Sequence, residues 1–246
     1  MDSVMNSSKR MENKVCLITG ATAGIGKVAA IALAGQCANL TIVGRNRQKT
    51  IETVQQIKME TGNDAVDYLV ADFSDLQQVN DLAIAFRERH DQLDVLINNA
   101  GTFFNTRQET PYGGVEATFL VNHLAPFLLT NALLDTIQNS NSARIMNVSS
   151  DAHKQDKMNF DDLGFRRGYI GIRAYARSKL ANILFTYELA RRLSGTDVTV
   201  NAVHPGHVAT DIWKTNFSFI GPALKWVTGL FALTPEEGAD NTIYLA

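Results

Sequence analysis

The features that are scarce in this sequence already exclude several classes of protein. It contains only 2 cysteines, Cys16 and Cys37, and it has neither a C-x-x-C pair nor a cysteine–histidine cluster. A structural metal site is therefore not expected. Two isolated thiols favour a reducing compartment, which predicts a cytoplasmic location. The net charge is only -2 at pH 7, so there is no electrostatic reason to expect a nucleic-acid partner.

Long apolar runs are also missing, so no transmembrane anchor is expected. The stretch 1–12 is polar, which is unlike a signal peptide and predicts a disordered N-terminal tail. Hydrophobic residues make up 45% of the 246-residue chain, enough for the core of one α/β domain. We expect that domain to cover 13–246, because no repeat or low-complexity tract divides this range.

Short apolar runs alternate with helical patterns along the chain. Strands are expected at 15–18, 40–43, 66–71, 93–97, 144–148 and 198–203. Helices are expected at 27–35, 48–60, 115–137 and 174–193, with two more starting in capping boxes at Ser74 and Thr234. This alternation predicts a three-layer, doubly wound parallel sheet with helices on both faces. Ligands of such sheets bind at the carboxyl ends of the strands.

A glycine-rich loop, T-G-A-T-A-G-I-G, connects the first expected strand to the first expected helix. Glycine permits a tight turn and a close approach of the backbone to a pyrophosphate, while the helix N-terminus offers free N–H groups and a positive dipole end. An ordinary glycine-rich turn is the alternative interpretation. The candidate phosphate-binding residues are Gly20, Thr22, Gly24, Ile25 and Gly26.

A tyrosine and a lysine lie four residues apart within the expected helix 174–193, so Tyr175 and Lys179 share one face. A nearby cation stabilises phenolate, which predicts that the pKa of Tyr175 is lowered from about 10 toward working pH. Tyr175 would then be a usable proton donor or acceptor. A Y-x-x-x-K pair also occurs by chance on solvated helices. The functional interpretation of this pair is favoured because a glycine-rich loop lies upstream in the same chain.

From about residue 13 to its end, the chain resembles the classical short-chain dehydrogenase/reductase family. The matching motifs are Thr19-Gly20-x-x-x-Gly24-x-Gly26, Asn98-Asn99-Ala100-Gly101, Ser149-Ser150, Tyr175-x-x-x-Lys179 and His204-Pro205-Gly206-x-Val208-x-Thr210. The stretches 149–153 and 178–182, and the long gap between Ser150 and Tyr175, are similar to the retinol dehydrogenase branch. The resemblance implies a Rossmann-type fold and hydride transfer with a nicotinamide cofactor.

The resemblance also implies the catalytic roles. Tyr175 would be the general acid in carbonyl reduction and the base in alcohol oxidation, and Lys179 would lower its pKa and hold the nicotinamide ribose. Ser150 would donate a hydrogen bond to the substrate oxygen, with Ser149 as the less favoured neighbour.

Asn122 matches the catalytic asparagine of the family, and the sequence adds a physical reason. Pro126 has no N–H to give to the Asn122 carbonyl, which predicts a kink in the helix at that point. The freed carbonyl could hold a water that leads toward Lys179. The alternative is a kinked helix in which Asn122 is simply packed.

The cofactor preference depends on the residues after the second expected strand. No acidic residue stands there to pair with a ribose 2′-hydroxyl, and Arg45 offers a planar guanidinium for a 2′-phosphate. NADP(H) is therefore preferred, with NAD(H) as the alternative. One departure weakens this preference: Ala23 occupies a loop position that is often basic in NADP-selective members of the family.

Further cofactor contacts follow from the resemblance. Asp72 would contact the adenine, although it could equally be a plain acidic residue at a helix start. Ala100 and Gly101 would let the backbone approach the cofactor, Asn99 would be structural, and Thr210 would anchor the nicotinamide amide. The remaining expected cofactor-binding residues are Asn98, Pro205, Gly206 and Val208.

The substrate is expected to be a hydrophobic aldehyde, ketone or alcohol. The stretch 207–233 is rich in large apolar residues and could form a lid, an ordinary core-covering helix pair or a membrane-facing surface. Phe103 and Phe104 could line the same pocket. Retinoid chemistry is implied by the branch resemblance alone.

The resemblance implies that the helices at 115–137 and 174–193 form a homodimer. Both carry apolar residues beyond one narrow stripe, which fits burial on a second side. The family normally continues past the last helix to a seventh strand, which this chain lacks, so the sixth strand should be an open sheet edge. A non-catalytic nucleotide-binding regulator or an inactive truncated form is the alternative function. A nucleotide-sugar epimerase is a third and weaker option.

Overall fold

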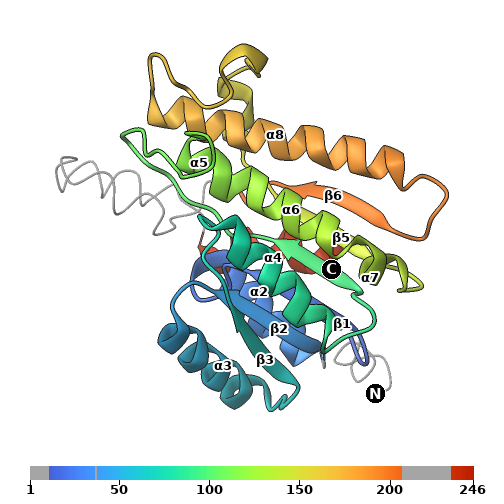
Figure 1. Cartoon of the computed structure of the whole chain (residues 1–246). Coiled ribbons are helices and arrows are strands. Elements are labelled where there is room, and N and C mark those ends of the chain that lie inside the picture. The colour runs from blue at the N-terminus through green and yellow to red at the C-terminus, as the bar shows by residue number, and fades with distance from the viewer. Residues whose placement is uncertain (1–10, 37, 207–233) are drawn as a thin grey trace.

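Six parallel strands form one sheet at the centre of the protein (Figure 1). The computed structural model describes residues 11–36, 38–206 and 234–246. The strands are β1 (Val15–Thr19), β2 (Asn39–Gly44), β3 (Val66–Val70), β4 (Val95–Asn98), β5 (Arg144–Val148) and β6 (Thr199–Val203). The longer helices are α2 (Gly24–Gly35), α3 (Arg47–Thr61), α4 (Leu76–Arg87), α8 (Gly171–Arg192) and α11 (Pro235–Leu245).

The strand order is β3-β2-β1-β4-β5-β6, and every neighbouring pair is parallel. The order reverses between β1 and β4, which are direct neighbours. Ligands bind at the carboxyl ends of the strands beside such a reversal. The doubly wound parallel sheet predicted from the alternating pattern is confirmed.

Side chains of each strand alternate between two hydrophobic cores, as the two-residue period of a strand requires. In β1, Cys16 and Ile18 pack with α2, α3 and α11. Leu17 lies on the other face with α4 and α8. Because both faces are covered by helices, most side chains of the inner strands are apolar and buried.

The helix expected over 115–137 is interrupted in the structure. It divides into α5 (Ala117–Phe119), the π-helix η1 (Leu120–Leu124), α6 (Ala125–Ala132) and α7 (Leu134–Gln138). Pro126 has no N–H for the carbonyl of Asn122, and the turn widens so that Ala125 N–H donates to Leu120 O. The predicted break at this point is confirmed, whereas one continuous helix is wrong.

The two predicted capping boxes have different outcomes. Thr234 caps α11 with reciprocal bonds to Glu237, at 3.2 and 2.8 Å, as predicted. Ser74 as the cap of α4 is wrong, because Asp75 accepts from the N–H of Gln77 at 2.9 Å. The Ser74 hydroxyl donates instead to Asp72 Oδ1 at 2.7 Å, which turns it away from the helix end.

Strand β6 pairs only with β5, so it is an edge of the sheet formed by the described residues, as predicted. Two 3-10 helices, η2 (Asp151–Gln155) and η3 (Phe160–Asp162), lie between β5 and α8. Within the ranges the structure describes, no helix has both the length and the apolar character that crossing a membrane requires. Cys16 is fully buried, and burial raises the pKa of its thiol, while Cys37 lies outside the described residues.

Candidate active site

The glycine loop between β1 and α2 has no room for a side chain at Gly20 or at Gly26, where α2 begins. Gly20 has a φ of 67°, and a Cβ atom on it would lie 2.9 Å from the Cα of Ala100. The Asn99 Nδ2 donates to the carbonyls of Thr19 and Gly20 at 2.9 and 3.1 Å. The structural role predicted for Asn99 is therefore seen directly, because its amide ties the loop to the end of β4.

The N-terminus of α2 lies at this loop. Ala23 at the N-cap has no side chain that can cap the helix, so the first-turn N–H groups are left for another acceptor. A Cβ atom on Gly26 would lie 2.7 Å from Gly20 O, so only glycine lets the helix approach this closely. Such a cradle at a helix N-terminus fits the pyrophosphate of a dinucleotide. The Ile25 side chain instead packs in the core against Ala239.

The end of β2 lies beside the same loop. A Cβ atom on Gly44 would lie 2.6 Å from the Thr22 methyl group, so Thr22 is in direct contact with the strand end. Arg45 follows Gly44 and is exposed, free to reach toward a ligand at this edge. Asp72, after β3, accepts from both the N–H and the hydroxyl of Ser74 at 2.9 and 2.7 Å. It therefore stabilises the turn before α4, whatever else it contacts.

Asn98, the last residue of β4, and Gly101, three residues later, have different surroundings. Asn98 is buried and donates through Nδ2 to Thr130 Oγ1 and Asn147 Oδ1, both at 2.9 Å. A cofactor contact through its side chain therefore finds no support. A Cβ atom on Gly101 would lie 3.5 Å from Asn122 Oδ1 and 3.7 Å from Lys179 Nζ, so Gly101 is placed beside two of the predicted catalytic residues.

The ends of β5 and α8 bring the predicted catalytic residues together. Ser150 is the second residue after β5, and its hydroxyl is hydrogen-bonded to the hydroxyl of Tyr175 in the first turns of α8. Lys179 Nζ donates to the carbonyl of Val148 at 2.8 Å and lies 5.5 Å from the centre of the Tyr175 ring. The neighbouring Ser149 donates to Lys179 O at 3.0 Å, so Ser149 is occupied by a buried structural bond.

The prediction that the pKa of Tyr175 is lowered is wrong for the protein without a bound cofactor. Burial raises the pKa of Tyr175 to about 12, and only the hydrogen bond with Ser150 acts in the opposite direction. Burial also lowers the pKa of Lys179 to about 8. Both effects have one cause, since a low-dielectric interior disfavours charged forms. The proximity of Lys179 predicts a lower pKa for Tyr175, but desolvation of the buried phenol raises it.

Asn122 is held in place by its side chain and its backbone. Its Oδ1 accepts from Thr102 N at 2.7 Å, and its Nδ2 donates to Thr102 O and Ser178 Oγ at 2.9 and 3.0 Å. Its carbonyl, which Pro126 leaves without a helical partner, accepts from Asn182 Nδ2 at 3.0 Å. The Asn122 carbonyl thus has a protein donor, and the water and its route to Lys179 stay a prediction.

The other expected site residues are only partly described. Pro205 and Gly206 follow β6, and Gly206 has a φ of 80°. Val208 and Thr210, with the whole apolar stretch 207–233, lie outside the described residues. Phe103 is buried with its ring edge-on to Tyr175 at 6.1 Å, so an apolar wall adjoins the tyrosine.

The comparison with protein families identifies the class of the chain. A family model described as short chain dehydrogenase matches residues 14–220. The chain belongs to the short-chain dehydrogenase family. It is therefore an oxidoreductase of the type that acts on CH–OH donors, and the family predicted from the sequence is confirmed.

Relatives of this dehydrogenase cover nearly all of the chain. Retinol dehydrogenase 14 of Mus musculus is 41% identical over 96% of the chain and 74% of its own length. Polyprenol dehydrogenase of Homo sapiens is 41% identical over 95% of the chain and 72% of its own length. A short-chain dehydrogenase of Escherichia coli, solved in complex with NADPH, is 25% identical with a TM-score of 0.77 over 97% of this chain and 92% of that one. The predicted similarity to the retinol dehydrogenase branch is confirmed.

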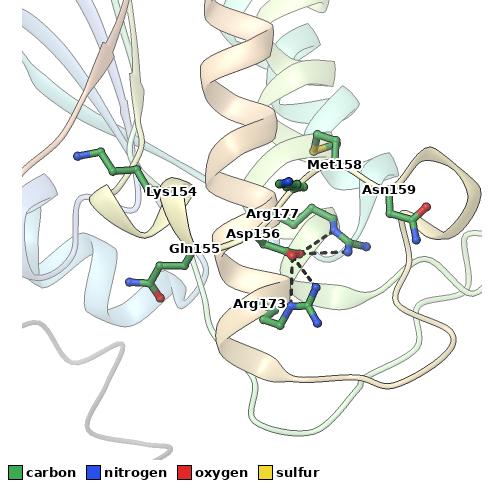
Figure 2. A pocket seen from close by; sticks show the side chains of 8 residues that line it. Lys154, Gln155, Asp156, Met158, Asn159, Arg173 and Arg177 are labelled. Atoms are coloured by element: carbon green, nitrogen blue, oxygen red, sulfur yellow. Dashed lines mark hydrogen bonds and ion pairs between the residues drawn. The ribbon is translucent and has the colours of Figure 1, made fainter.

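A separate polar hollow of about 410 Å³ lies beside α8 of the dehydrogenase (Figure 2). It is lined by Lys154, Gln155, Asp156, Lys157, Met158, Asn159, Arg173 and Arg177. None of the predicted catalytic residues lines it, and its charged lining does not suit a hydrophobic substrate. This hollow is therefore not the substrate pocket expected from the sequence.

Two site residues of the dehydrogenase were missed at the sequence level, although a signal was present. Ser178 and Asn182 lie three and seven positions after Tyr175, which places them on the same helix face as Tyr175 and Lys179. Both contact Asn122. Extending the helical face beyond the Y-x-x-x-K pair would have identified them.

Proposed function

We propose that the protein is an NADP(H)-dependent oxidoreductase that interconverts a hydrophobic aldehyde or ketone with its alcohol. The observation that carries the proposal is the hydrogen bond between the hydroxyls of Ser150 and Tyr175, with Lys179 on the same helix face. Two adjacent hydroxyls can both donate to one carbonyl oxygen, where negative charge develops during reduction. The turn at Ala100 and Gly101 links the cradle to these residues, because Gly20 lies against Ala100 and Gly101 lies beside Lys179.

The chain's own residues would manage the proton and the substrate oxygen. When bound, the nicotinamide supplies or accepts the hydride. Tyr175 donates its hydroxyl proton to the substrate oxygen in reduction, and its raised pKa keeps that proton in place until charge develops. Alcohol oxidation is the reverse: Tyr175 must first give its proton to solvent, and the resulting phenolate then takes the hydroxyl proton of the alcohol. Lys179, whose pKa of about 8 lies near working pH, can exchange protons with its surroundings.

The preference for NADP(H) is supported by Arg45, which is exposed directly after β2. Its guanidinium can bind a 2′-phosphate through two parallel hydrogen bonds. The E. coli relative that was solved with NADPH supports the same choice. NAD(H) remains the alternative, because Ala23 contributes no cation within the glycine loop.

The proposed substrate class follows from the relatives and from the apolar wall. Retinol and polyprenol, after which two of the relatives are named, are both long apolar alcohols. The Phe103 ring next to Tyr175 suits an apolar group attached to the reacting carbon. Retinol is one member of this class, and another apolar alcohol of similar length would make the same contacts.

A homodimer is proposed through α6 and α8. Large apolar side chains are exposed on these helices, among them Phe127 at 44%, Leu184 at 45% and Tyr187 at 73%. Phe127 and the partly buried Phe185 bring the two helices together in one aromatic surface, with ring centres 5.1 Å apart. Light scattering should give twice the monomer mass, and a monomer at micromolar concentration would contradict this assembly. The cytoplasmic location stays a prediction.

The function is tested by turnover of paired carbonyls with both cofactors. Retinal-like and other long apolar aldehydes, and small aldehydes of the same reactivity, are mixed with NADPH or NADH, and loss of the reduced nicotinamide absorbance is followed. We expect turnover of the apolar aldehydes with NADPH. Tight NADPH binding without turnover of any carbonyl would favour a non-catalytic nucleotide-binding regulator instead.

A further inference from the structure

We propose that Arg177 is a positioning residue that holds the segment 151–165 on α8 and thereby sets the place of the Ser150 hydroxyl against Tyr175. The inference rests on the proposed function, since it concerns the same catalytic pair. Arg177 stands between the tyrosine and the lysine of the Y-x-x-x-K pattern, at a position that the pattern leaves open to any residue.

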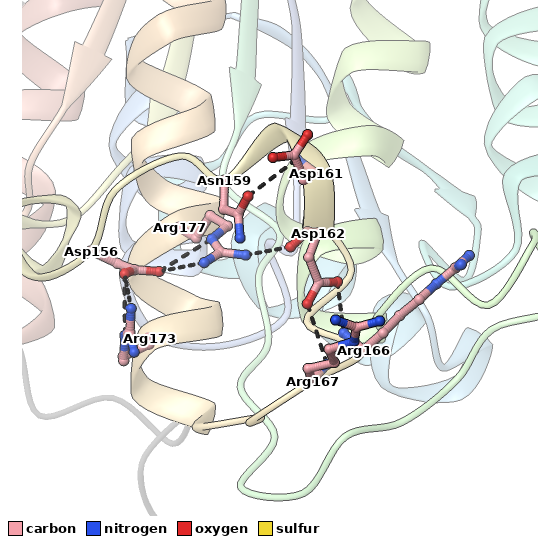
Figure 3. Close-up of polar contacts among 8 residues, drawn as sticks. All are labelled: Asp156, Asn159, Asp161, Asp162, Arg166, Arg167, Arg173 and Arg177. Carbon is pink, nitrogen blue, oxygen red and sulfur yellow. Dashed lines mark hydrogen bonds and ion pairs between the residues drawn. The ribbon is translucent and has the colours of Figure 1, made fainter.

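Arg177 is a buried cation with three separate contacts, and only 4% of it is exposed. Its Nε donates to Asp156 Oδ2 at 3.2 Å, and its Nη1 donates to the carbonyl of Asp162 at 2.6 Å (Figure 3). The Cζ lies 3.6 Å from the centre of the Phe165 ring. A charge is rarely buried without several such partners, because its desolvation must be offset by paired groups.

Asp156 is the matching anion on the segment, and 4% of its side chain is exposed. It accepts from Arg177 on one oxygen and from Arg173 Nη2 at 2.8 Å on the other (Figure 2). The two arginines stand two residues before and two residues after Tyr175 in α8. Asp156 is therefore fixed to the part of the helix that carries the tyrosine.

One short helix connects this anion to Ser150. Ser150 is the N-cap of η2, where its Oγ accepts from Ala152 N at 3.2 Å, and Asp156 is the C-cap of the same helix. The 3-10 helix between them has only 5 residues. A displacement of Asp156 is thus transmitted along η2 to Ser150, and hence to the hydrogen bond that Ser150 shares with Tyr175.

Phe165 supplies an independent sign that the segment is held under constraint. It is a buried bulky residue with a φ of 47°, in the left-handed region that such residues rarely adopt. Its ring lies between the guanidinium of Arg177 and the Tyr169 ring, which is edge-on at 6.0 Å. A backbone in this conformation persists only where its surroundings over-determine it, and such sites cluster near function.

The test uses substitutions that keep the charge. In Arg177→Lys, a single ammonium group replaces the planar guanidinium. The ammonium cannot contact the Asp156 carboxylate, the Asp162 carbonyl and the face of the Phe165 ring at the same time. Arg191→Lys is the matched control, because Arg191 is exposed near the other end of α8 and pairs only with Glu188 there. NADPH binding by each variant, measured by fluorescence titration, reports that the nucleotide fold is intact.

Arg177→Lys should lower kcat about tenfold while KM for the aldehyde and the Kd for NADPH stay within about twofold. Arg191→Lys should leave all three constants within about twofold of wild type. The deciding measurement is made in a Ser150→Ala background, which should itself be slower by about 100-fold or more. If Arg177 acts through Ser150, adding Arg177→Lys to that background should change kcat by less than about twofold.

Three results would overturn the inference. An Arg177→Lys enzyme with wild-type kcat shows that the contacts do not govern the catalytic pair. Losses that multiply in the double variant show that Arg177 acts independently of Ser150. If wild type binds NADPH but reduces no carbonyl, the proposed function is wrong, and this inference is wrong with it. If wild type reduces carbonyls and either of the first two results is found, only this inference is wrong.

Discussion

Replacing Asn182 with leucine tests how the π-helix at Asn122 is stabilised. The Asn182 side chain donates to Asn122 O at 3.0 Å, and its Oδ1 lies 3.0 Å from His123 Nδ1. Because Nδ2 must donate to a carbonyl, Oδ1 faces the imidazole, and His123 must carry its proton on Nδ1. Leucine has nearly the same shape and removes both bonds.

The expected cost follows from the partners that are left behind. The Asn122 carbonyl is buried, and an unsatisfied buried acceptor costs about 1–3 kcal/mol. The lost bond to His123 contributes about 1 kcal/mol, and the extra apolar surface of leucine offsets a similar amount. We expect Asn182→Leu to lower the free energy of unfolding by about 2 kcal/mol.

The control is Asn131→Leu on α6. Asn131 also donates to a helical carbonyl, that of Phe127 at 2.7 Å, but it is exposed, so water can replace the lost bond. Its expected cost is below about 0.5 kcal/mol. Urea unfolding at constant NADPH concentration measures both variants. Equal stabilities of the two variants would refute the claim that Asn182 supports the π-helix.

Three further predictions address the cofactor site and stability. Gly26→Ala should weaken NADPH binding at least about tenfold, because its Cβ would collide with Asn99 and the loop carbonyl; unchanged titration curves would contradict this. Arg45→Ala should lower the NADPH-to-NADH ratio of kcat/KM about tenfold or more, and an unchanged ratio would remove Arg45 from the cofactor site. Asp94→Asn should lower the free energy of unfolding of the protein at neutral pH. Burial opposes ionisation of Asp94, but hydrogen bonds, including one from Ser140, outweigh it and hold its pKa below 3.8. The contribution of Asp94 to stability is present above its pKa in the unfolded chain and is lost as pH falls through its pKa in the folded protein. The free energies of unfolding of wild type and Asp94→Asn should therefore converge in acid. A difference that stays constant with pH would contradict the assignment.

The fold followed from local patterns because the sheet is covered on both faces. Strands that are buried on both faces appear in the sequence as apolar runs, such as 15–18 and 40–43. The alternation of such strands with helices permits few sheet topologies. The meeting of Ser150 and Tyr175 was predictable in the same way, because one follows a strand end and the other opens the next long helix.

The features that sequence reasoning missed depend on the surroundings of a residue after folding. The pKa of Tyr175 was predicted to fall because Lys179 is four residues away, but burial of the phenol raises it instead. Asn98 resembles a cleft residue by motif and is turned toward Thr130 and Asn147. Arg177 looks like a solvated helix residue until the segment 151–165 covers it.

The proton-transfer role of Tyr175 is tested most directly by removing one hydroxyl. Tyr175→Phe is compared with Tyr187→Phe, which alters an exposed tyrosine on the same helix, 73% exposed. With NADPH and an apolar aldehyde that wild type reduces, Tyr175→Phe should bind NADPH normally and lose about 100-fold or more in kcat, whereas Tyr187→Phe should match wild type. Equal turnover by the two variants would contradict the assignment of Tyr175 as the general acid.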